Sequence, residues 1–428
     1  MTRSTMNSST KKNSFQEVPN PFCGTLPDDL KITVTNNQLK VMNTSCPITK
    51  AGFERKLPTN LSPQIDGKDV SLEQAIAKAT SIIKKSGNTL FAGLGTDVAG
   101  NRNILEVADK VGGTVDHMLG DGIMRNVLAM SDKGWIMSTL TEIKNRADLV
   151  IFVGTDATEH SRFHERILWS DDALFVDPAE RDLVYLGKKL DTKPGVSPKG
   201  KKPTSIPCDI PELPAVMNTL NALIDGKSLQ ARTVGGAKTA DLQKLADKIK
   251  AAEYAVFIWS PPKLGFDNAE LAVGAISDVV RKLTETQRVA GFSLGGGEGA
   301  ATAIAVCTWQ TGYPTRVSFA KGFPDYNPTR YSTSEMLSSG QAEAMFWVST
   351  ISSNKLPPAT KIPMVVIGEA GMKLKSTPDV FIPAGTPGID HIGKMVRVDS
   401  VVSLPMKKLR DVGLPSVASI FEKIHQAL

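Results

Sequence analysis

The sequence predicts an α/β fold, in which a small N-terminal β module precedes two doubly wound units with parallel sheets. The first observation is a series of short apolar runs bounded by turn residues, which is typical of strands buried on both faces of a parallel sheet. The second is that helical patterns alternate with these runs along most of the 428 residues. The third is the dipeptide Asn36-Asn37 between two strand-like stretches, because asparagine tolerates the positive φ of a tight hairpin turn.

Each element is predicted from its local pattern. Ser71 and Gln74 form a capping box, and apolar side chains then recur at helical spacing. Helices are predicted over residues 71–83, 103–111, 240–252, 268–283 and 298–308. Strands are predicted over residues 30–35, 38–42, 89–93, 148–154, 173–177, 254–259, 289–293, 344–349 and 363–368.

This order of elements suggests four parts. Residues 1–14 are polar and lack the apolar middle of a secretory signal, so we expect a disordered tail. Residues 191–214, rich in Pro, Lys and Gly, are expected to be a surface loop or linker. The other expected parts are a small module (15–66), a first α/β domain (67–140 with 326–428) and a second α/β domain (141–325).

Composition indicates a globular protein of the cytoplasm. Apolar residues make up 41% and charged residues 22% of the chain, and the net charge of +6 is spread widely. No run approaches the ~18 apolar residues of a membrane span, and aromatic residues do not interleave with the basic segment, so neither membrane nor nucleic acid is an expected partner. Four scattered cysteines do not suggest a disulfide framework.

Two glycine-rich turns could bind anions. The turn at residues 93–100 follows a strand, but its spacing is not that of a dinucleotide fingerprint, so an ordinary βα loop is favoured over nicotinamide binding. Gly295, Gly296 and Gly297 open a helix and could cradle a phosphate or carboxylate. Glu298 would repel an anion there, so a turn required by sterics is favoured.

Two other groups of residues have both a functional and a structural interpretation. His160 and His164 have the spacing of two zinc ligands, but Arg162 lies between them and no third ligand follows, so no metal site is predicted. A basic segment could attract a polyanionic ligand or an acidic partner surface, although a solvated loop is the default interpretation. Its lysines are Lys188, Lys189, Lys193, Lys199, Lys201 and Lys202.

Three segments resemble the B subunit of formylmethanofuran dehydrogenase. Residues 20–30 (NPFCGTLPDDL) are similar to its opening, where that family has Cys-x-x-Cys-x-x-x-Cys-Asp-Asp and a fourth cysteine about twenty residues later. Residues 307–314 (CTWQTGYP), continued by Tyr-Asn-Pro at 326–328, look like a second stretch of the family. Residues 142–154 look like a third.

The resemblance implies cofactor sites that this sequence lacks. The four cluster positions correspond to Asn20, Cys23, Pro27 and Cys46, of which only two are thiols, so a [4Fe–4S] cluster is not expected. The family's molybdenum- or tungsten-binding Cys or selenocysteine falls in residues 120–129, which contain no cysteine. No resident cofactor, no metal and no catalytic residue are therefore predicted.

The same double loss is found in the B subunit of the formyltransferase/hydrolase complex of methylotrophic bacteria. The resemblance implies two α/β units of the molybdopterin oxidoreductase (formate dehydrogenase-like) type, retained as a non-redox scaffold. It also implies three partners, which are a zinc amidohydrolase-like subunit, a formyltransferase subunit and a C-type subunit. That complex moves formyl from formyl-tetrahydromethanopterin to methanofuran and releases formate, and a methanofuran-type cofactor is expected to contact it. The alternatives are an active Mo/W-pterin dehydrogenase subunit and an independent nucleotide-binding protein.

Overall fold

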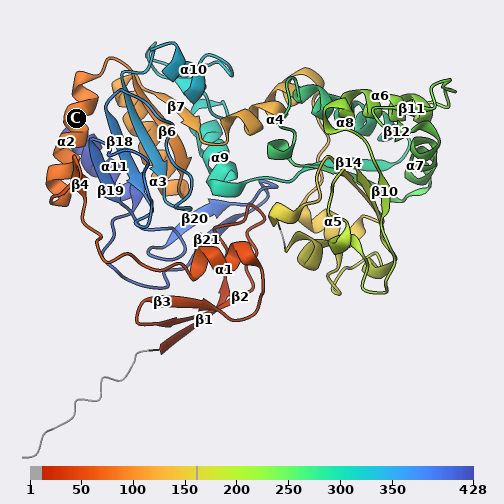
Figure 1. The fold of residues 1–428 in the computed structure, drawn as a ribbon, viewed down its shortest axis with the longest axis horizontal. Helices are drawn as coiled ribbons and strands as arrows, with labels where there is room; N and C mark the ends of the chain where they lie inside the picture. Colours follow the sequence, from red (N-terminus) through yellow and green to blue (C-terminus); the bar gives the residue numbers. More distant parts are fainter. Residues whose placement is uncertain (1–11, 161) are drawn as a thin grey trace, which may run out of the picture. The chain divides into compact units, whose positions relative to one another are not determined.

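The computed structural model describes residues 12–160 and 162–428, which form two compact units. Unit 1 takes in the described residues up to Met118 together with Gly297–Val396 and Ser403–Leu428. Unit 2 consists of Leu119–Gly296 and Arg397–Val402. Each unit is built on its own sheet with parallel strands and packed helices (Figure 1), so the predicted mixed α/β fold with parallel sheets is confirmed.

The described part of unit 1 contains a nine-stranded sheet in the order β16-β15-β7-β6-β17-β18-β19-β4-β5. The central strands β7, β6, β17, β18 and β19 are all parallel, and the outer strands pair antiparallel. Every residue of β6 and β17 is buried, as expected for apolar runs inside a parallel sheet. The bounds are β4 Gln64–Ile65, β5 Lys68–Asp69, β6 Thr89–Gly95, β7 Thr114–His117, β15 Val317–Ser318, β16 Asp325–Tyr326, β17 Ala344–Ser349, β18 Met364–Gly368 and β19 Val380–Pro383.

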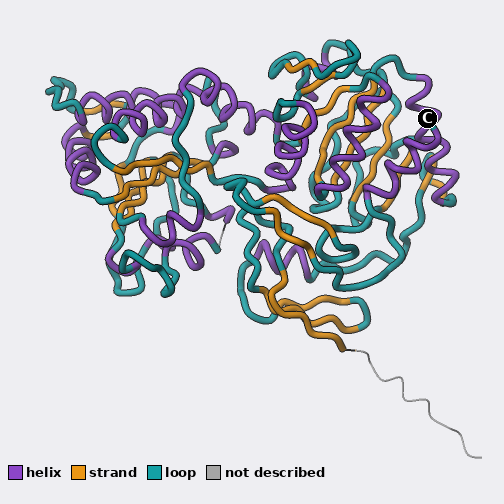
Figure 2. Tube along the Cα trace, turned by 180° about the vertical axis from the view of Figure 1, so that it is seen from behind, coloured by secondary structure: helices purple, strands orange, loops and turns teal. Residues whose placement is uncertain are grey.

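Helices cover one face of this sheet in a single hydrophobic cluster (Figure 2). They are α2 Leu72–Lys85, α3 Val98–Val111, α9 Ala300–Thr311 and α11 Val417–Ala427. The predicted capping box is present at the start of α2, where both Ser71 and Gln74 make their reciprocal hydrogen bonds. The opposite face packs against α10 (Thr333–Ser338) and neighbouring loops.

The N-terminal module belongs to unit 1. Its strands β1 (Lys12–Val18), β2 (Leu30–Thr35) and β3 (Gln38–Val41) form an antiparallel sheet, and Asn36 and Asn37 turn the chain at φ 50° and 62° as predicted. Its apolar side chains pack against Ile389 and Leu409, on either side of the hairpin of β20 (Gly393–Val396) and β21 (Ser403–Met406).

Unit 2 has a wholly parallel sheet in the order β10-β9-β8-β13-β14. One face packs against α6, α7 and α8, and the other against α5 and the π-helix His164–Leu168. The strand bounds are β8 Leu149–Val153, β9 Asp182–Leu186, β10 Thr204–Ile206, β11 Thr233–Val234, β12 Ala237–Lys238, β13 Tyr254–Trp259 and β14 Arg288–Ser293. The helix bounds are α4 Gly120–Lys133, α5 Leu140–Arg146, α6 Leu213–Ile224, α7 Thr239–Ala251 and α8 Glu270–Leu283. In the two described ranges, no helix has the length and apolar character that crossing a lipid bilayer requires.

Two local predictions in unit 2 are wrong. Residues 173–177 form an exposed loop instead of a buried strand, because the next segment, β9, pairs with β8 in its place. Phe175 lies beneath the guanidinium of Arg146, with the guanidinium carbon 3.9 Å from the ring centroid. The expected linker at residues 191–214 is also more ordered than predicted, since it contributes the edge strand β10.

The unit boundaries differ from the expected domain division. The expected boundaries followed residues 140 and 325, whereas the chain passes between units after Met118, Gly296, Val396 and Val402. The helix α4 packs on α8 of unit 2, while α9 and β15 complete the layers of unit 1. Of the expected disordered tail, residues 1–11 lie outside the described residues, and Lys12–Ser14 begin β1.

Candidate functional site

Three of the four residues that match the family's cluster positions are brought together around α1 (Pro47–Phe53). Cys46 is the N-cap of this helix, because its Sγ accepts a hydrogen bond from Thr49 N at 3.3 Å. Asn20 is 1% exposed and donates from Nδ2 to Thr49 Oγ1 at 2.9 Å. The backbone N–H of Asn20 donates to the carbonyl oxygen of Pro27 at 2.9 Å. The chain thus folds these positions together, as the resemblance implies, and joins them through hydrogen bonds.

The donor atoms at these positions do not fit a four-thiolate cluster. The carboxamide of Asn20 is used on both sides, since its Oδ1 also accepts from Phe22 N at 3.0 Å. Pro27 carries no side-chain donor atom, and the Sγ of Cys23 lies 3.1 Å from Thr25 Oγ1. Residues 120–129, which form most of α4, likewise offer no thiolate for a soft metal.

The carboxyl edge of the unit 1 sheet has the topology of a ligand-binding edge. From β6 the chain continues to β7 on one side, whereas β17, β18 and β19 extend on the other. Open α/β sheets bind ligands where the strand order reverses in this way, which here lies between the carboxyl ends of β6 and β17. Gly95 and Thr350 meet there, since both the backbone N–H and the hydroxyl of Thr350 donate to Gly95 O.

Glu298 lies over this edge in an unusual conformation. It occupies the turn Gly297–Gly299 at φ 52°, and the backbone of Gly299 fits so closely on Thr96 that an added Cβ would lie 3.0 Å from Thr96 O. Glu298 Oε2 is buried and has no hydrogen-bond partner among the described residues. Burial raises the pKa of Glu298 to about 7, although Lys355 and Arg55 oppose this shift.

His117 supports the backbone of the Glu298 turn. It ends β7, and its Nε2 lies 3.1 Å from the carbonyl oxygen of Glu298, to which it donates in the Nε2-protonated tautomer. Burial lowers the pKa of His117 to about 4, so the ring is neutral near pH 7. Glu298 therefore has a pKa shifted to about 7 at the carboxyl edge of the sheet, where it can exchange a proton or accept a hydrogen bond.

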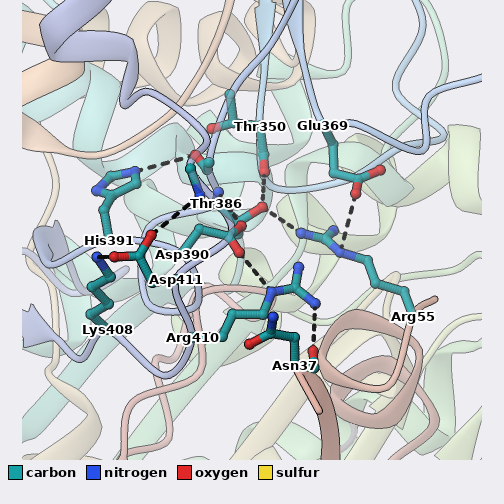
Figure 3. Close-up of polar contacts among 12 residues, drawn as sticks. Asn37, Arg55, Thr350, Glu369, Thr386, Asp390, His391, Lys408, Arg410 and Asp411 are labelled. Carbon is teal, nitrogen blue, oxygen red and sulfur yellow. Dashed lines mark hydrogen bonds and ion pairs between the residues drawn. The ribbon is translucent and has the colours of Figure 1, made fainter. Parts of the chain in front are cut away.

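A buried network beside this edge starts at Arg55, which closely follows α1. Its guanidinium donates to the carbonyl oxygen of Ile351 at 2.8 Å and to the hydroxyl of Thr386, and its Nε lies 3.5 Å from Glu369 Oε1 (Figure 3). Thr386 extends the network, because its hydroxyl also donates a hydrogen bond to Thr350 O at 2.6 Å. The module is thereby fixed to the carboxyl ends of β17, β18 and β19.

Asp390 and Arg410 complete the network. Arg410 Nε donates to Asp390 Oδ1 at 2.7 Å, and both side chains are at most 3% exposed. Asp390 Oδ2 accepts from Thr386 N, and Arg410 Nη1 donates to the carbonyl oxygen of Asn37 in the module (Figure 3). Sequence patterns missed Arg55, Thr386, Asp390 and Arg410, because the partners are up to 373 positions apart and no local signal links them.

The triple glycine joins the two units. Gly296 ends a segment of unit 2, and Gly297 begins the next segment of unit 1. An added Cβ would meet nothing within 4 Å at Gly295 or Gly297, whereas Gly296 has φ +77°, so a sterically required turn exists at Gly296 only. The glycine-rich turn at residues 93–100 requires glycine at its first position, because Gly93 has φ +86° and lies against the backbone of Val348.

Half of the six lysines in the basic segment of unit 2 are paired with acids. Lys188 contacts Asp209 at 2.8 Å, and Lys199 bridges Asp177 and Glu180. Lys201 is also paired, since it lies 2.7 Å from Asp182. The three lysines without an ion pair to a described residue are Lys189, Lys193 and Lys202.

His160 and His164, which have the spacing of two zinc ligands, are both buried. His164 Nε2 lies 2.8 Å from the hydroxyl of Tyr185, and burial lowers the pKa of both His160 and His164 to about 4. Arg162 pairs with Glu165 at 2.8 Å. Among residues 12–160 and 162–428, no three His, Cys, Asp or Glu side chains are grouped as metal ligands would be.

The sequence comparisons agree with the expected resemblance. No model of a known protein family matches the chain. It is 25% identical over 424 residues to the B subunit of the tungsten-containing formylmethanofuran dehydrogenase 2 of Methanocaldococcus jannaschii, covering 91% of this chain and 92% of the relative. It is 24% identical over 326 residues to the B subunit of the formyltransferase/hydrolase complex Fhc of Methylorubrum extorquens, covering 76% of this chain and 85% of the relative.

The fold comparison leads to the same group of proteins. A chain in the crystal structure of the formyltransferase/hydrolase complex FhcABCD from Methylorubrum extorquens with methylofuran has a TM-score of 0.70 and 22% sequence identity, covering 86% of this chain and 98% of that one. The predicted resemblance is therefore confirmed: along most of its length the chain is homologous to the B subunits of formylmethanofuran dehydrogenase and of the Fhc complex.

Proposed function

We propose that this chain is the B subunit of a formyltransferase/hydrolase assembly and has no redox role. Its units would retain the molybdopterin oxidoreductase type of fold that the resemblance implies, while two of the four cluster cysteines and the metal-binding Cys or selenocysteine are missing from the sequence. Similarity to the Fhc B subunit and to a chain of the FhcABCD structure supports membership of such an assembly.

The hydrogen bond between Asn20 and Thr49 carries this proposal. In a working dehydrogenase subunit, the position of Asn20 would present a thiolate to a [4Fe–4S] cluster. Here its carboxamide supports α1 by bonding to Thr49, and Cys46 caps the same helix. Side-chain hydrogen bonds thus fill a role in holding the module together that the cluster would fill in the redox family.

In this proposal the chain serves as a scaffold. A formyltransferase subunit moves formyl from formyl-tetrahydromethanopterin to methanofuran, and a zinc amidohydrolase-like subunit then releases formate. This chain and a C-type subunit hold those partners in place. The two α/β units would provide the surfaces, and the buried network from Arg55 to Arg410 would keep the N-terminal module rigid.

A methanofuran-type cofactor would contact the basic segment of unit 2. Lys189, Lys193 and Lys202 are the lysines best placed for this role, because they are not engaged in ion pairs with described residues. Lys188, Lys199 and Lys201 already neutralise neighbouring acids and would contribute less to attracting an anion.

Co-purification from the native host tests the proposal. The tagged chain should elute with a formyltransferase, a zinc amidohydrolase-like protein and a C-type subunit, each identified by mass. The eluate should release formate from formyl-tetrahydromethanopterin when methanofuran is supplied. Elution with an electron-transfer protein in place of the formyltransferase would contradict the proposal.

A second candidate is a redox-active dehydrogenase subunit. It is favoured by the M. jannaschii relative, which is matched over a larger share of this chain than the Fhc subunit is. The redox role would require a different set of metal donors from the family's thiolates. It predicts formate-dependent electron transfer by the purified assembly, whereas the scaffold proposal predicts none.

A further inference from the structure

Residues 307–328, which include the second stretch that resembles the family, carry both buried and exposed side chains. Cys307, Val317 and Phe319 are in the core of unit 1. Three large aromatic side chains of the same stretch face solvent instead. They are Trp309, Tyr313 and Phe323, which are 62%, 40% and 56% exposed. The fold explains the first group, but it gives the exposed group no packing role.

Tyr313, one of the three exposed aromatic residues, is held in place by its surroundings. Gly312 ends α9 in the left-handed conformation, and the hydroxyl of Thr311 accepts from Tyr313 N at 3.1 Å while donating to Cys307 O at 2.7 Å. Tyr313 then stacks on Tyr326 of β16, with ring centroids 5.2 Å apart and an interplanar angle of 5°. The stacked rings of Tyr313 and Tyr326 are therefore held against each other before any partner binds, which lowers the entropy cost of using these two rings in an interface.

These side chains come from neighbouring elements at one edge of the sheet. Trp309 is on the last turn of α9, shortly before Tyr313, and Phe323 is in the loop that leads into β16. In the part of unit 1 that the structure describes, β16 is the outermost strand on that side of the sheet and no further strand covers it. We call Trp309, Tyr313, Phe323 and Tyr326 the aromatic platform.

The charges beside the platform favour an acidic partner. Asp325 is used internally, because it contacts Lys321 at 2.8 Å and accepts from the Tyr331 hydroxyl. The exposed guanidinium of Arg330 bonds to the amide oxygen of Gln341 and lies over the Tyr331 ring. Arg330 makes no ion pair within the described ranges, so it adds one positive charge beside the Lys321–Asp325 pair.

We propose that the aromatic platform is the docking surface for another subunit of the assembly. The partner would present an apolar recess that takes the Trp309 and Phe323 side chains, with a carboxylate at its edge opposite Arg330. Exposed Trp and Tyr side chains with a nearby Arg are the residue types that dominate binding energy in protein interfaces. The inference rests on the proposed function, because it assumes that such partners exist.

The test uses the full chain co-expressed with its partner subunits. The variants are Trp309→Ala, Phe323→Ala and Arg330→Glu, and the control is Ile392→Ala, an equally exposed apolar residue elsewhere in unit 1. We expect each aromatic variant to bind one partner subunit with an affinity at least about tenfold lower than that of the wild type. Its far-ultraviolet circular dichroism and Tm should stay unchanged. The Arg330→Glu substitution should weaken binding of the same subunit, and the loss of affinity should be largest at low salt.

Each alternative result contradicts a specific statement. Retention of every subunit by the Trp309→Ala/Phe323→Ala double variant would overturn the docking surface while leaving the proposed function intact. A wild-type chain that dimerises through these residues, as judged by light scattering, would replace the partner subunit with a second copy and also overturn the inference. A wild-type chain that binds none of the expected subunits would contradict the proposed function itself.

Discussion

Asn20 and Thr49 are linked by a 2.9 Å hydrogen bond between Nδ2 and Oγ1, at the position where the redox family has a cluster ligand. Thr49 is completely buried on α1, and Asn20 is 1% exposed. The contact joins the segment before β2 to α1 within the N-terminal module.

Replacement of Thr49 by valine removes the acceptor and leaves Asn20 Nδ2 buried without a partner. We expect the free energy of unfolding of unit 1 to fall by about 1–3 kcal/mol, the cost of an unsatisfied buried polar group. Urea denaturation measures this change. The matched control is Thr35→Val in β2, which should alter stability by less than about 0.5 kcal/mol. Equal stabilities of Thr49→Val and the control would contradict the structural role of this bond.

Asp390 and Asp411 provide a comparison of two ion pairs with similar distances and different burial. The Asp390–Arg410 pair is 2.7 Å long and almost completely buried, whereas the Asp411–Lys408 pair is 2.6 Å long and exposed. Removal of Asp390 leaves the Arg410 charge buried and unpaired, so Asp390→Ala should cost about 3–5 kcal/mol. Asp411→Ala should cost less than about 1 kcal/mol. Urea denaturation of both variants checks the difference, and similar losses would show that the network does not stabilise the module.

Glu298 should give unit 1 a measurable dependence of stability on pH. Its pKa is about 7 in the fold and 4.5 as the ordinary value, so the folded state binds the proton more tightly. The stability that the protonated Glu298 carboxyl contributes is fully present below pH 4.5 and is lost as the pH rises through 7. The shift corresponds to about 3 kcal/mol at 1.36 kcal/mol per pKa unit.

Comparison with the Glu298→Gln variant isolates this group. The buried histidines titrate in an overlapping range with the opposite sign, but they are the same in both proteins. We expect the stability of Glu298→Gln relative to wild type to increase between pH 5 and pH 8, measured by urea denaturation at each pH. A difference independent of pH would contradict the burial of an ionisable carboxyl.

Exchange of Lys189 and Lys202 for glutamate tests contact with a methanofuran-type cofactor. Neither change breaks an ion pair between described residues, so the fold of unit 2 should be retained. We expect weaker cofactor binding by the assembly at low ionic strength and a smaller difference at high salt. Isothermal titration with methylofuran measures both. Unchanged affinity at low salt would remove the basic segment from the binding surface.

Local patterns predicted much of the fold because the information lies within a few residues. Ser71 and Gln74 are three positions apart and make the predicted capping box, while Asn36 and Asn37 make the predicted turn. The error at residues 173–177 has the same origin. Four apolar residues fit a strand equally well there, and only the pairing of β9 with β8 decides between the two segments.

The candidate site could be predicted only in part. The resemblance identified Asn20, Cys23, Pro27 and Cys46 as corresponding positions, and the fold brings three of them to α1. The buried network could not be predicted, since Arg55 and Thr386 are 331 positions apart and are joined only by the tertiary fold. Glu298 was recognised for its charge, but its burial depends on the whole carboxyl edge of the sheet.

Metal analysis of the native assembly tests the central claim, that this chain has no redox cofactor of its own. Tungsten, molybdenum and iron should be measured by mass spectrometry in the purified complex, with zinc in the hydrolase subunit as an internal standard. The account predicts stoichiometric zinc and only traces of the other three metals. Tungsten or molybdenum at one atom per chain, or four iron atoms, would contradict it.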